Sequence, residues 1–113
     1  MRFTLPYPPS ANRYYRNVGR RTLISREGRA YREKVRTILP AGLTAPLAGP
    51  VAVYVDVFPP DRRRRDLDNT QKALLDALQH GGAYEDDSQI ALLHIERRDV
   101  VKDGKVVVRI ERL

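Results

Sequence analysis

The chain has 113 residues, of which 42% are hydrophobic, and this is enough for one domain with a modest core. It contains no cysteine, which excludes disulfides, zinc–thiolate sites and cysteine nucleophiles. Its 21 Lys and Arg residues against 14 acidic ones give a net charge of +7, which favours a polyanionic partner, nucleic acid before an anionic membrane. No stretch approaches the roughly 20 apolar residues of a membrane span, and the proline-rich start does not resemble a secretory signal.

The first part of the chain predicts two short strands and a helix. Residues 2–6 alternate enough for an opening strand, and the proline-rich, arginine-rich stretch 6–21 predicts a loop over the surface. Residues 21–25 predict a second short strand. Ser25 is then a good N-cap for a helix over 26–39 that ends at Pro40, with a thin apolar stripe of Ala30, Val35, Ile38 and Leu39.

After a turn-rich linker at 41–50, the rest of the chain predicts three strands and one helix. The alternating, β-branched run 51–58 is the clearest strand. Asp68 is predicted to cap a helix that runs to His80, with Gln71 at the capping-box position. Residues 89–101 predict a strand, and the Asp103–Gly104 turn returns 105–113 antiparallel to it. The predicted fold is α+β: a single domain over residues 1–113, with a mostly antiparallel or mixed sheet and two helices.

Asp66 and Asp68 stand two residues apart just before the second helix. In an extended segment they share one face, and Leu67 points the other way, into the core. Two carboxylates on one face repel each other unless a positive group lies between them, and Mg²⁺ takes oxygen ligands of this kind. The structural alternative is that Asp68 caps the helix and Asp66 interacts with the positive end of its dipole.

A third acidic group, 85–87, follows the same helix after a diglycine turn. It starts at the far end of the helix from Asp66, because a helix rises about 1.5 Å per residue. These residues return beside Asp66 only if the strand they enter neighbours the strand that leads to Asp66. Adjacent residues of an extended chain face opposite ways, so Asp86 and Asp87 are not equivalent. The residues alone do not choose between them, and a polar acidic loop is the alternative.

Lys72 lies one helical turn after Asp68 and one turn before Asp76. Ion pairs at this spacing stabilise a helix by about 0.2–0.5 kcal/mol. The functional alternative is that a cation one turn above a metal carboxylate holds the scissile phosphate or the attacking water. Without other information, a surface ion pair is the simpler interpretation.

Two basic stretches are candidates for contact with nucleic acid. The arginine run between the strand 51–58 and the second helix is tethered at both ends, so its like charges need a compensating polyanion or the nearby aspartates. Guanidinium groups suit phosphate oxygens, which predicts backbone contacts from Arg62, Arg63, Arg64 and Arg65. In the stretch NRYYR, Arg13 and Arg16 suit phosphate, while Tyr14 or Tyr15 either stacks on an unpaired base or is a core residue with a wet tip.

The chain resembles the RusA family of Holliday junction resolvases over nearly its whole length. The family's N-terminal stretch, LP-aromatic-PPS-x-NRYYR, reads LPYPPSANRYYR here (5–16). Its DRRRRDLDN block reads DRRRRDLDNTQKALLDAL (61–78), and its later DD-x-Q motif lies in EDDSQI (85–90). The pattern S-x-EG-x-AYR between these blocks reads SREGRAYR (25–32). The middle block is the most specific of the four.

The resemblance implies an Mg²⁺-dependent endonuclease that acts as a homodimer on four-way DNA junctions. It assigns the essential metal-binding carboxylates to Asp66, Asp68 and Asp87, and the essential lysine to Lys72. It therefore selects Asp87 over Asp86, which the residues alone do not. Mn²⁺ is expected to substitute for Mg²⁺, and no small-molecule cofactor is implied.

The expected function is resolution of Holliday junctions by paired symmetric nicks on opposed strands, in homologous recombination and DNA repair. The products would be ligatable and carry 5′ phosphates. The expected partners are four-way junction DNA and a second copy of the chain, with no membrane. We expect a soluble cytoplasmic protein acting at the nucleoid, encoded by a bacterium, a prophage or a phage.

Two alternatives remain. One is a metal-dependent nuclease for other branched DNA or for RNA, and the other is a junction-binding protein without catalysis. A degenerate copy should have lost at least one of the four candidate catalytic residues, and all four are present. The dimer surface also stays open, because the strands at 51–58 and 106–110 suit either such a surface or the core.

Overall fold

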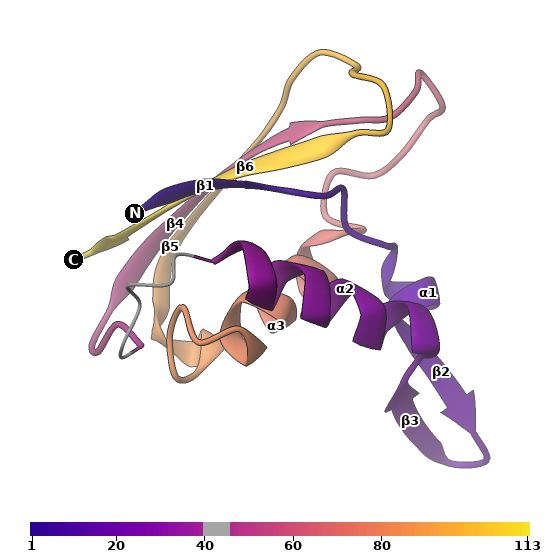
Figure 1. Ribbon diagram of the computed structural model, residues 1–113, viewed down its shortest axis with the longest axis horizontal. Helices are drawn as coiled ribbons and strands as arrows, with labels where there is room; N and C mark the ends of the chain where they lie inside the picture. Colours follow the sequence, from indigo (N-terminus) through magenta and orange to yellow (C-terminus); the bar gives the residue numbers. More distant parts are fainter. Residues whose placement is uncertain (40–45) are drawn as a thin grey trace.

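The computed structural model describes residues 1–39 and 46–113. Its elements are, in chain order, β1 (Arg2–Leu5), α1 (Ala11–Tyr14), β2 (Tyr15–Val18), β3 (Arg21–Ile24), α2 (Arg26–Ile38), β4 (Val51–Phe58), α3 (Gln71–His80), the 3₁₀ turn η1 (Asp87–Gln89), β5 (Ile90–Arg97) and β6 (Lys105–Arg112). The helices α2 and α3 cover one face of a four-stranded sheet, and the β2–β3 hairpin projects from this body (Figure 1). The predicted α+β class is confirmed. Pro40 and the first part of the expected linker lie outside the described residues.

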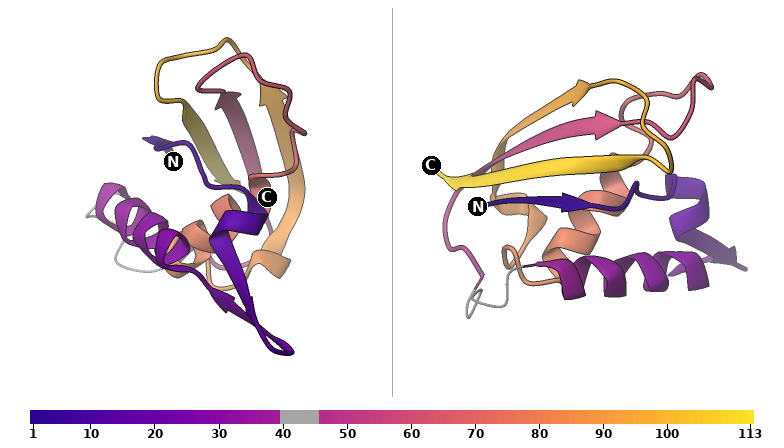
Figure 2. Two further views of the ribbon diagram at one scale, coloured as in Figure 1. Left: turned by 90° about the vertical axis from the view of Figure 1, so that its right-hand side faces the viewer. Right: turned by 45° about the horizontal axis from the view of Figure 1, so that its top comes forward.

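The main sheet is mixed, with strand order β1-β6-β4-β5. β6 pairs antiparallel with both β1 and β4, whereas β5 is parallel to β4. Two successive parallel strands need a connection that crosses back along the sheet, and α3 makes this crossing on the covered face (Figure 2). The start of α3 therefore follows the end of β4, and the end of α3 leads to the start of β5.

Residues 105–113 run antiparallel to the strand at 89–101, as predicted, but the expected pairing of these two strands in a hairpin is wrong. The Asp103–Gly104 turn is present, with φ angles of 66° and 67°, but β6 then pairs with β4 and β1. Burial explains this choice. In the middle of the sheet, between β1 and β4, β6 has a neighbouring strand on each edge, and its apolar residues Val106, Val108 and Ile110 are buried. At the edge of the sheet beyond β5, β6 would have one neighbouring strand, and these residues would be partly exposed.

The core lies between the covered face of the sheet and the two helices. β4 contributes every second residue of its length, and α3 contributes its apolar side. Burying a large apolar side chain stabilises the fold by about 1.5–3 kcal/mol. The strands at 51–58 and 106–110, which the sequence left open between core and dimer surface, thus supply the core with their inward sides. The buried residues of β4 and α3 are Val51, Val53, Val55, Val57, Ala73, Leu74, Ala77 and Leu78.

The helix α2 starts at its predicted cap, Ser25, but buries a different stripe from the predicted one. Ala30 and Ile38 are exposed. Tyr31 is buried because its hydroxyl donates to a main-chain carbonyl at 2.8 Å, which satisfies its polar tip. The stripe that packs on the core is Tyr31, Val35 and Leu39. No helix in the described part of the chain is long and apolar enough to cross a membrane.

The predicted loop at 6–21 contains the one-turn helix α1 and the strand β2. The prolines that suggested a loop end at Pro9, before α1 begins. The N–H of Ala11 donates to the main-chain oxygen of Asn69 at 3.1 Å, so α1 is attached to the turn before α3. β2 pairs antiparallel with β3, and β3 is the second strand that the sequence predicted. Gly19, with a φ of 61°, lies in the turn between them.

Candidate active site

The segment between the arginine run and α3 folds into two overlapping turns. The N–H of Asn69 donates to the main-chain oxygen of Asp66 at 3.2 Å, and the N–H of Gln71 donates to that of Asp68 at 3.1 Å. The helix therefore begins after Thr70, and no side chain caps it. The prediction that Asp68 caps α3 is wrong, because the chain makes a further turn before the helix starts. Its carboxylate is exposed instead.

Asp66 and Asp68 are both exposed, and Leu67 between them packs against the core. This is the predicted alternation. Among the described residues, neither carboxylate has an ion-pair or side-chain hydrogen-bond partner. Two carboxylates two residues apart are thus free to meet a cation at the start of α3.

Lys72 lies in the first turn of α3 and is exposed. In the described part of the chain it forms no ion pair with Asp68 or Asp76, so the surface ion pair is not observed. Its ammonium nitrogen lies 5.3 Å from the centroid of the Tyr15 ring. Such a contact is worth about 0.5–1 kcal/mol at an exposed site, and it leaves the charge of Lys72 uncommitted to any carboxylate.

The turn η1 gives Asp86 and Asp87 different environments. A side-chain oxygen of Asp86 accepts from the N–H of Ser88 at 3.0 Å and caps η1, and this bond lowers the pKa of Asp86. Asp87 uses its main-chain N–H, which donates to the side-chain oxygen of Gln79 at 3.0 Å. Partial desolvation and the neighbouring Asp86 raise the pKa of Asp87, and Lys72 partly offsets this. Asp86 therefore caps η1 with its side chain, whereas the carboxyl group of Asp87 caps nothing and lies near enough to Lys72 for that charge to lower its pKa.

The three candidate aspartates lie along α3 rather than in one cluster. β5 lies next to β4, which is the condition for Asp87 to return beside Asp66, but the two strands are parallel and not antiparallel. Asp87 therefore lies towards the start of β4, whereas Asp66 lines a hollow with Val57 and Arg97 at the far end. Within residues 1–39 and 46–113, no group of three or more His, Asp or Glu side chains lies close enough to hold a metal ion. The donors at Asp66 and Asp68 still fit Mg²⁺, which usually takes one or two carboxylates together with water and substrate phosphates.

Asp76, one turn after Lys72, is part of a closed charge network. Arg32 of α2 donates to one oxygen of Asp76 from two nitrogens, at 3.0 and 2.7 Å. The hydroxyl of Tyr14 donates to the same oxygen and accepts from Arg32 at 2.9 Å, and burial raises the pKa of Tyr14. Tyr15 packs edge-on against Tyr14 at 4.8 Å. Tyr14 is thus a core residue with a satisfied hydroxyl, and Tyr15 lies between it and Lys72.

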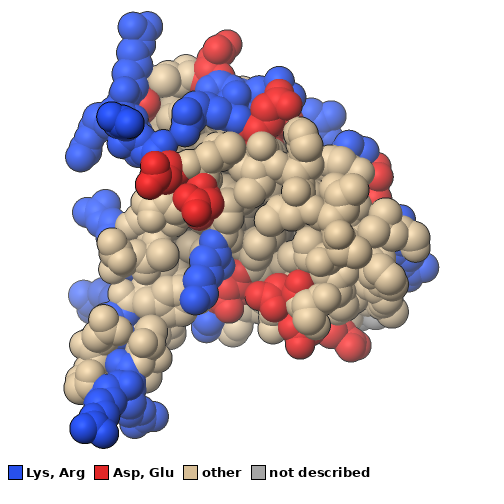
Figure 3. Space-filling model, turned by 180° about the vertical axis from the view of Figure 1, so that it is seen from behind, with Lys and Arg blue, Asp and Glu red and all other residues tan. Residues whose placement is uncertain are grey.

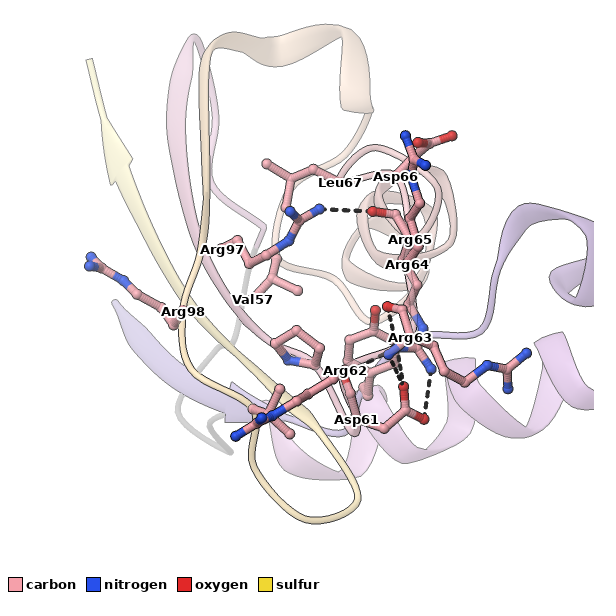
Figure 4. A pocket seen from close by; sticks show the side chains of 13 residues that line it. Val57, Asp61, Arg62, Arg63, Arg64, Arg65, Asp66, Leu67, Arg97 and Arg98 are labelled. Atoms are coloured by element: carbon pink, nitrogen blue, oxygen red, sulfur yellow. Dashed lines mark hydrogen bonds and ion pairs between the residues drawn. The ribbon is translucent and has the colours of Figure 1, made fainter.

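The arginine run borders a hollow of about 350 Å³ at the end of the sheet (Figure 4). Arg65 donates to both oxygens of Asp61, at 2.6 and 3.0 Å, and this pair lowers the pKa of Asp61 to about 2. Arg97, at the end of β5, donates to the main-chain oxygen of Arg65 at 2.8 Å and ties the loop to the sheet. Arg65 therefore shapes the loop, whereas Arg62, Arg63 and Arg64 are exposed.

Basic side chains gather at two ends of one face, with acidic side chains between them (Figure 3). One end is the exposed loop at 62–64, and the other is the β2–β3 hairpin with the start of α2. Arg16 is exposed on the hairpin, and Arg13 is exposed with a carboxylate oxygen of Glu27 at 3.9 Å. The predicted basic residues thus flank the segment that carries the aspartates.

Two residues outside the predicted set also shape the site. Gln79, which binds the N–H of Asp87, lies seven residues after Lys72 and so on the same side of α3. That spacing is visible in the sequence. Arg97 was not detectable from the sequence, because its contact with the arginine loop depends on β5 lying beside β4.

Comparison with known proteins places the chain in a family. The family model for endodeoxyribonuclease RusA matches residues 6–111. The crossover junction endodeoxyribonuclease RusA of Shigella sonnei (strain Ss046) is 48% identical over 111 residues, which cover 97% of this chain and 92% of the relative. The proteins of the same name from Escherichia coli (strain K12) and Enterobacteria phage 82 are 47% and 46% identical over the same lengths. Nucleases of this family depend in general on a metal ion. The chain belongs to the RusA family of endodeoxyribonucleases.

Proposed function

We propose that residues 1–113 form one endonuclease domain that acts as a homodimer, uses Mg²⁺ and resolves four-way DNA junctions by paired symmetric nicks. The products would be ligatable and carry 5′ phosphates, as suits homologous recombination and DNA repair. The observation that carries the proposal is a set of charged side chains that form no ion pair or side-chain hydrogen bond with any described residue: the carboxylates of Asp66 and Asp68, and the ammonium of Lys72. Relatives of nearly equal length are named crossover junction endodeoxyribonucleases, which supports the substrate.

Asp66 and Asp68 would bind the metal from the turn before α3, because their oxygens are exposed and two residues apart. Asp87 is the proposed third ligand and would have to approach this pair when metal and DNA bind. When bound, the metal would polarise the phosphate, favour hydroxide over water and stabilise the departing 3′ oxygen. Mn²⁺ has the same preference for oxygen ligands and is expected to substitute.

Lys72 would contact the phosphate that is cut. It lies in the first turn of α3, soon after Asp66 and Asp68, and its charge is near enough to Asp87 to lower the pKa of that carboxyl group. A cation there would stabilise the negative charge that develops on the pentacovalent phosphate. The Tyr15 ring, at the base of the hairpin, lies 5.3 Å from the ammonium nitrogen of Lys72 and would help to hold it in place.

The exposed arginines would hold the DNA backbone against the aspartates. Arg62, Arg63 and Arg64 at one end and Arg16 with Arg13 at the other are free to meet phosphates. Neutralised phosphates release counterions, so binding should weaken steeply with salt. Arg65 would act on DNA less directly, through the loop that it shapes with Asp61.

A homodimer follows from the chemistry of resolution. One chain carries one Asp66–Asp68 pair and would cut one strand, whereas a ligatable resolution needs two cuts related by symmetry. A two-fold dimer supplies two such sites in the matching arrangement.

The test is cleavage of a synthetic four-way junction in Mg²⁺ or Mn²⁺, with a linear duplex, a replication fork, a flap and an RNA duplex as comparison substrates. The proposal predicts paired symmetric nicks in the junction, none in the linear duplex, and none with Asp68→Asn. Stronger cleavage of forks, flaps or RNA would make the protein a different metal-dependent nuclease. Tight junction binding without any cut in either metal would make it a junction-binding protein.

A further inference from the structure

The hairpin β2–β3 is a strongly exposed part of the described structure. It projects from the body beside α1 and the start of α2 (Figure 1, Figure 2). Every residue from 16 to 22 is exposed, and both strands pair only with each other. A two-stranded hairpin without a covered face is marginally stable in water, so its extension beyond the body serves contact rather than the core.

The hairpin is held firmly at its base despite this exposure. The hydroxyl of Ser25 donates to the main-chain oxygen of Tyr14 at 2.9 Å and accepts from the N–H of Gly28 at 2.9 Å. A side chain at Gly28 would collide with that same oxygen and with Ile24, so only glycine allows α2 to approach so closely. The base of the hairpin is therefore locked to α2, and its tip has a defined direction.

The tip combines one apolar side chain with positive charge. Val18 is 48% exposed, although it is a large hydrophobic residue, and it precedes the Gly19 turn. Arg16, Arg20 and Arg21 surround it and are exposed, and no acidic residue occurs between positions 14 and 26. An apolar tip flanked by arginines suits a site where unstacked bases lie between phosphate backbones.

We propose that this hairpin inserts its Val18 tip into the open centre of the four-way junction and so distinguishes the branch point from a continuous duplex. This rests on the proposed function. The apolar side chain would pack against the faces of the bases at the branch, while the arginines bind the phosphates of the adjacent arms. A continuous duplex offers no such opening, since its bases are stacked without a gap.

The position of the hairpin relative to Lys72 suits this role. Tyr15 at the base contacts Lys72, and Val18 lies three residues further along the strand. At about 3.4 Å per residue the tip stands about 10 Å from Tyr15, which is about three base steps of 3.4 Å along one DNA strand. The tip and Lys72 can therefore contact DNA around the same branch point, which would couple recognition of the branch to the position of the cut.

The experiment uses a junction with 2-aminopurine beside the branch point, whose fluorescence rises when the base unstacks. The Asp68→Asn protein serves as the background, because it would bind in Mg²⁺ without cutting. Val18→Ser removes the apolar tip, Val18→Leu keeps it, and Ile38→Ser changes an equally exposed hydrophobic residue at the far end of α2 (42% exposed). Binding to the junction and to a linear duplex is measured for each.

The inference predicts a fluorescence rise with the background protein, Val18→Leu and Ile38→Ser, and at most half of it with Val18→Ser. Val18→Ser should also lower the preference for junction over duplex about tenfold, the scale of one stacked base, with duplex affinity unchanged. Equal losses for junction and duplex would place the hairpin in the groove of an arm and overturn the inference. If Val18→Ser leaves both the fluorescence rise and the preference for the junction unchanged, the inference is also overturned. If the background protein itself shows no preference for the junction over the duplex, the proposed function fails, and the inference fails with it.

Discussion

Two aspartates at α3, Asp76 within the helix and Asp68 just before it, differ in whether other side chains of the protein bind their carboxylates. Asp76, in the middle of the helix, accepts two bonds from Arg32 and one from the buried Tyr14. Asp68, just before the helix, has no partner among the described side chains and does not even serve as a cap. The two aspartates are eight residues apart, yet one is fully partnered and the other is free.

This difference separates stability from chemistry on one helix. A paired and partly buried charge resists removal because its partners would be left unsatisfied. An unpaired exposed charge contributes little to folding, and two of them side by side repel each other until a cation arrives. Substitutions at the two kinds of position should therefore change different measurable quantities.

The largest expected effect is at the metal-binding pair. Asp66→Asn should lower junction cleavage about a thousandfold, since it removes one of the three proposed carboxylate ligands. The midpoint of thermal unfolding should not fall, because the Asp66 carboxylate is exposed and binds no side chain in the described part of the chain. Single-turnover cleavage and a melting curve check both statements. A large drop in melting temperature would mean that Asp66 is a structural residue.

The neighbours Asp86 and Asp87 provide a matched pair. Asp87→Asn should reduce cleavage about a hundredfold, whereas Asp86→Asn should leave cleavage within about threefold and keep the cap of η1, because Asn caps a helix about as well as Asp does. The same cleavage assay and urea unfolding measure the two effects. Equal activity of the two variants would refute the assignment of Asp87.

Lys72 should behave like the aspartates rather than like a surface ion pair. Lys72→Ala is expected to slow cleavage about fiftyfold, with junction affinity changed only a few-fold, because its charge acts mainly on the transition state. Lys72→Arg should recover part of the rate. The account loses support if affinity falls as much as the rate does.

Arg32→Met tests the paired carboxylate, Asp76. It should lower the free energy of unfolding by about 2 kcal/mol, which lies between the contributions of exposed and of buried ion pairs. The variant leaves Asp76 and the hydroxyl of Tyr14 short of a partner. Cleavage per folded molecule should stay within about threefold. Urea unfolding and cleavage at a temperature below the transition provide the two readings.

The smallest effect is expected from the exposed arginines. Replacing Arg62, Arg63 and Arg64 with Ala should weaken DNA binding and reduce the slope of log affinity against log salt by about 0.9 for each phosphate that is no longer neutralised. Melting temperature should hardly change, in contrast to Arg65→Ala, which opens the pair with Asp61. An unchanged salt slope in the triple variant would exclude these residues from DNA contact.

The sequence predicted the local elements better than their arrangement. The alternation in β4, the Ser25 cap and the Asp103–Gly104 turn are local signals, and the structure contains all three. The pairing of β6 with β4 and β1 is non-local and follows from how much apolar surface each neighbour covers. The strand β2 was hidden because prolines close to it suggested a loop, and its partner strand alone did not reveal the hairpin.

The candidate site was partly predictable for the same reason. The Asp66–Leu67–Asp68 alternation can be seen from spacing, and the motifs shared with the family pointed to Lys72 and Asp87 as candidates. Spacing also suggested the cap at Asp68, which is absent, because a further turn from Asp68 to Gln71 delays the start of α3. The distinction between Asp86 and Asp87 depends on the η1 turn, which no periodic pattern announces.

The central claim, that charge left unpaired around α3 performs the chemistry while paired charge maintains the fold, is tested most directly by one measurement on two variants. Junction cleavage in Mg²⁺ and thermal unfolding are recorded side by side for Asp68→Asn and Asp76→Asn. The account predicts that Asp68→Asn loses cleavage and keeps its melting temperature, whereas Asp76→Asn loses several degrees and cleaves normally below its transition. The opposite pattern, or loss of both properties in both variants, would contradict it.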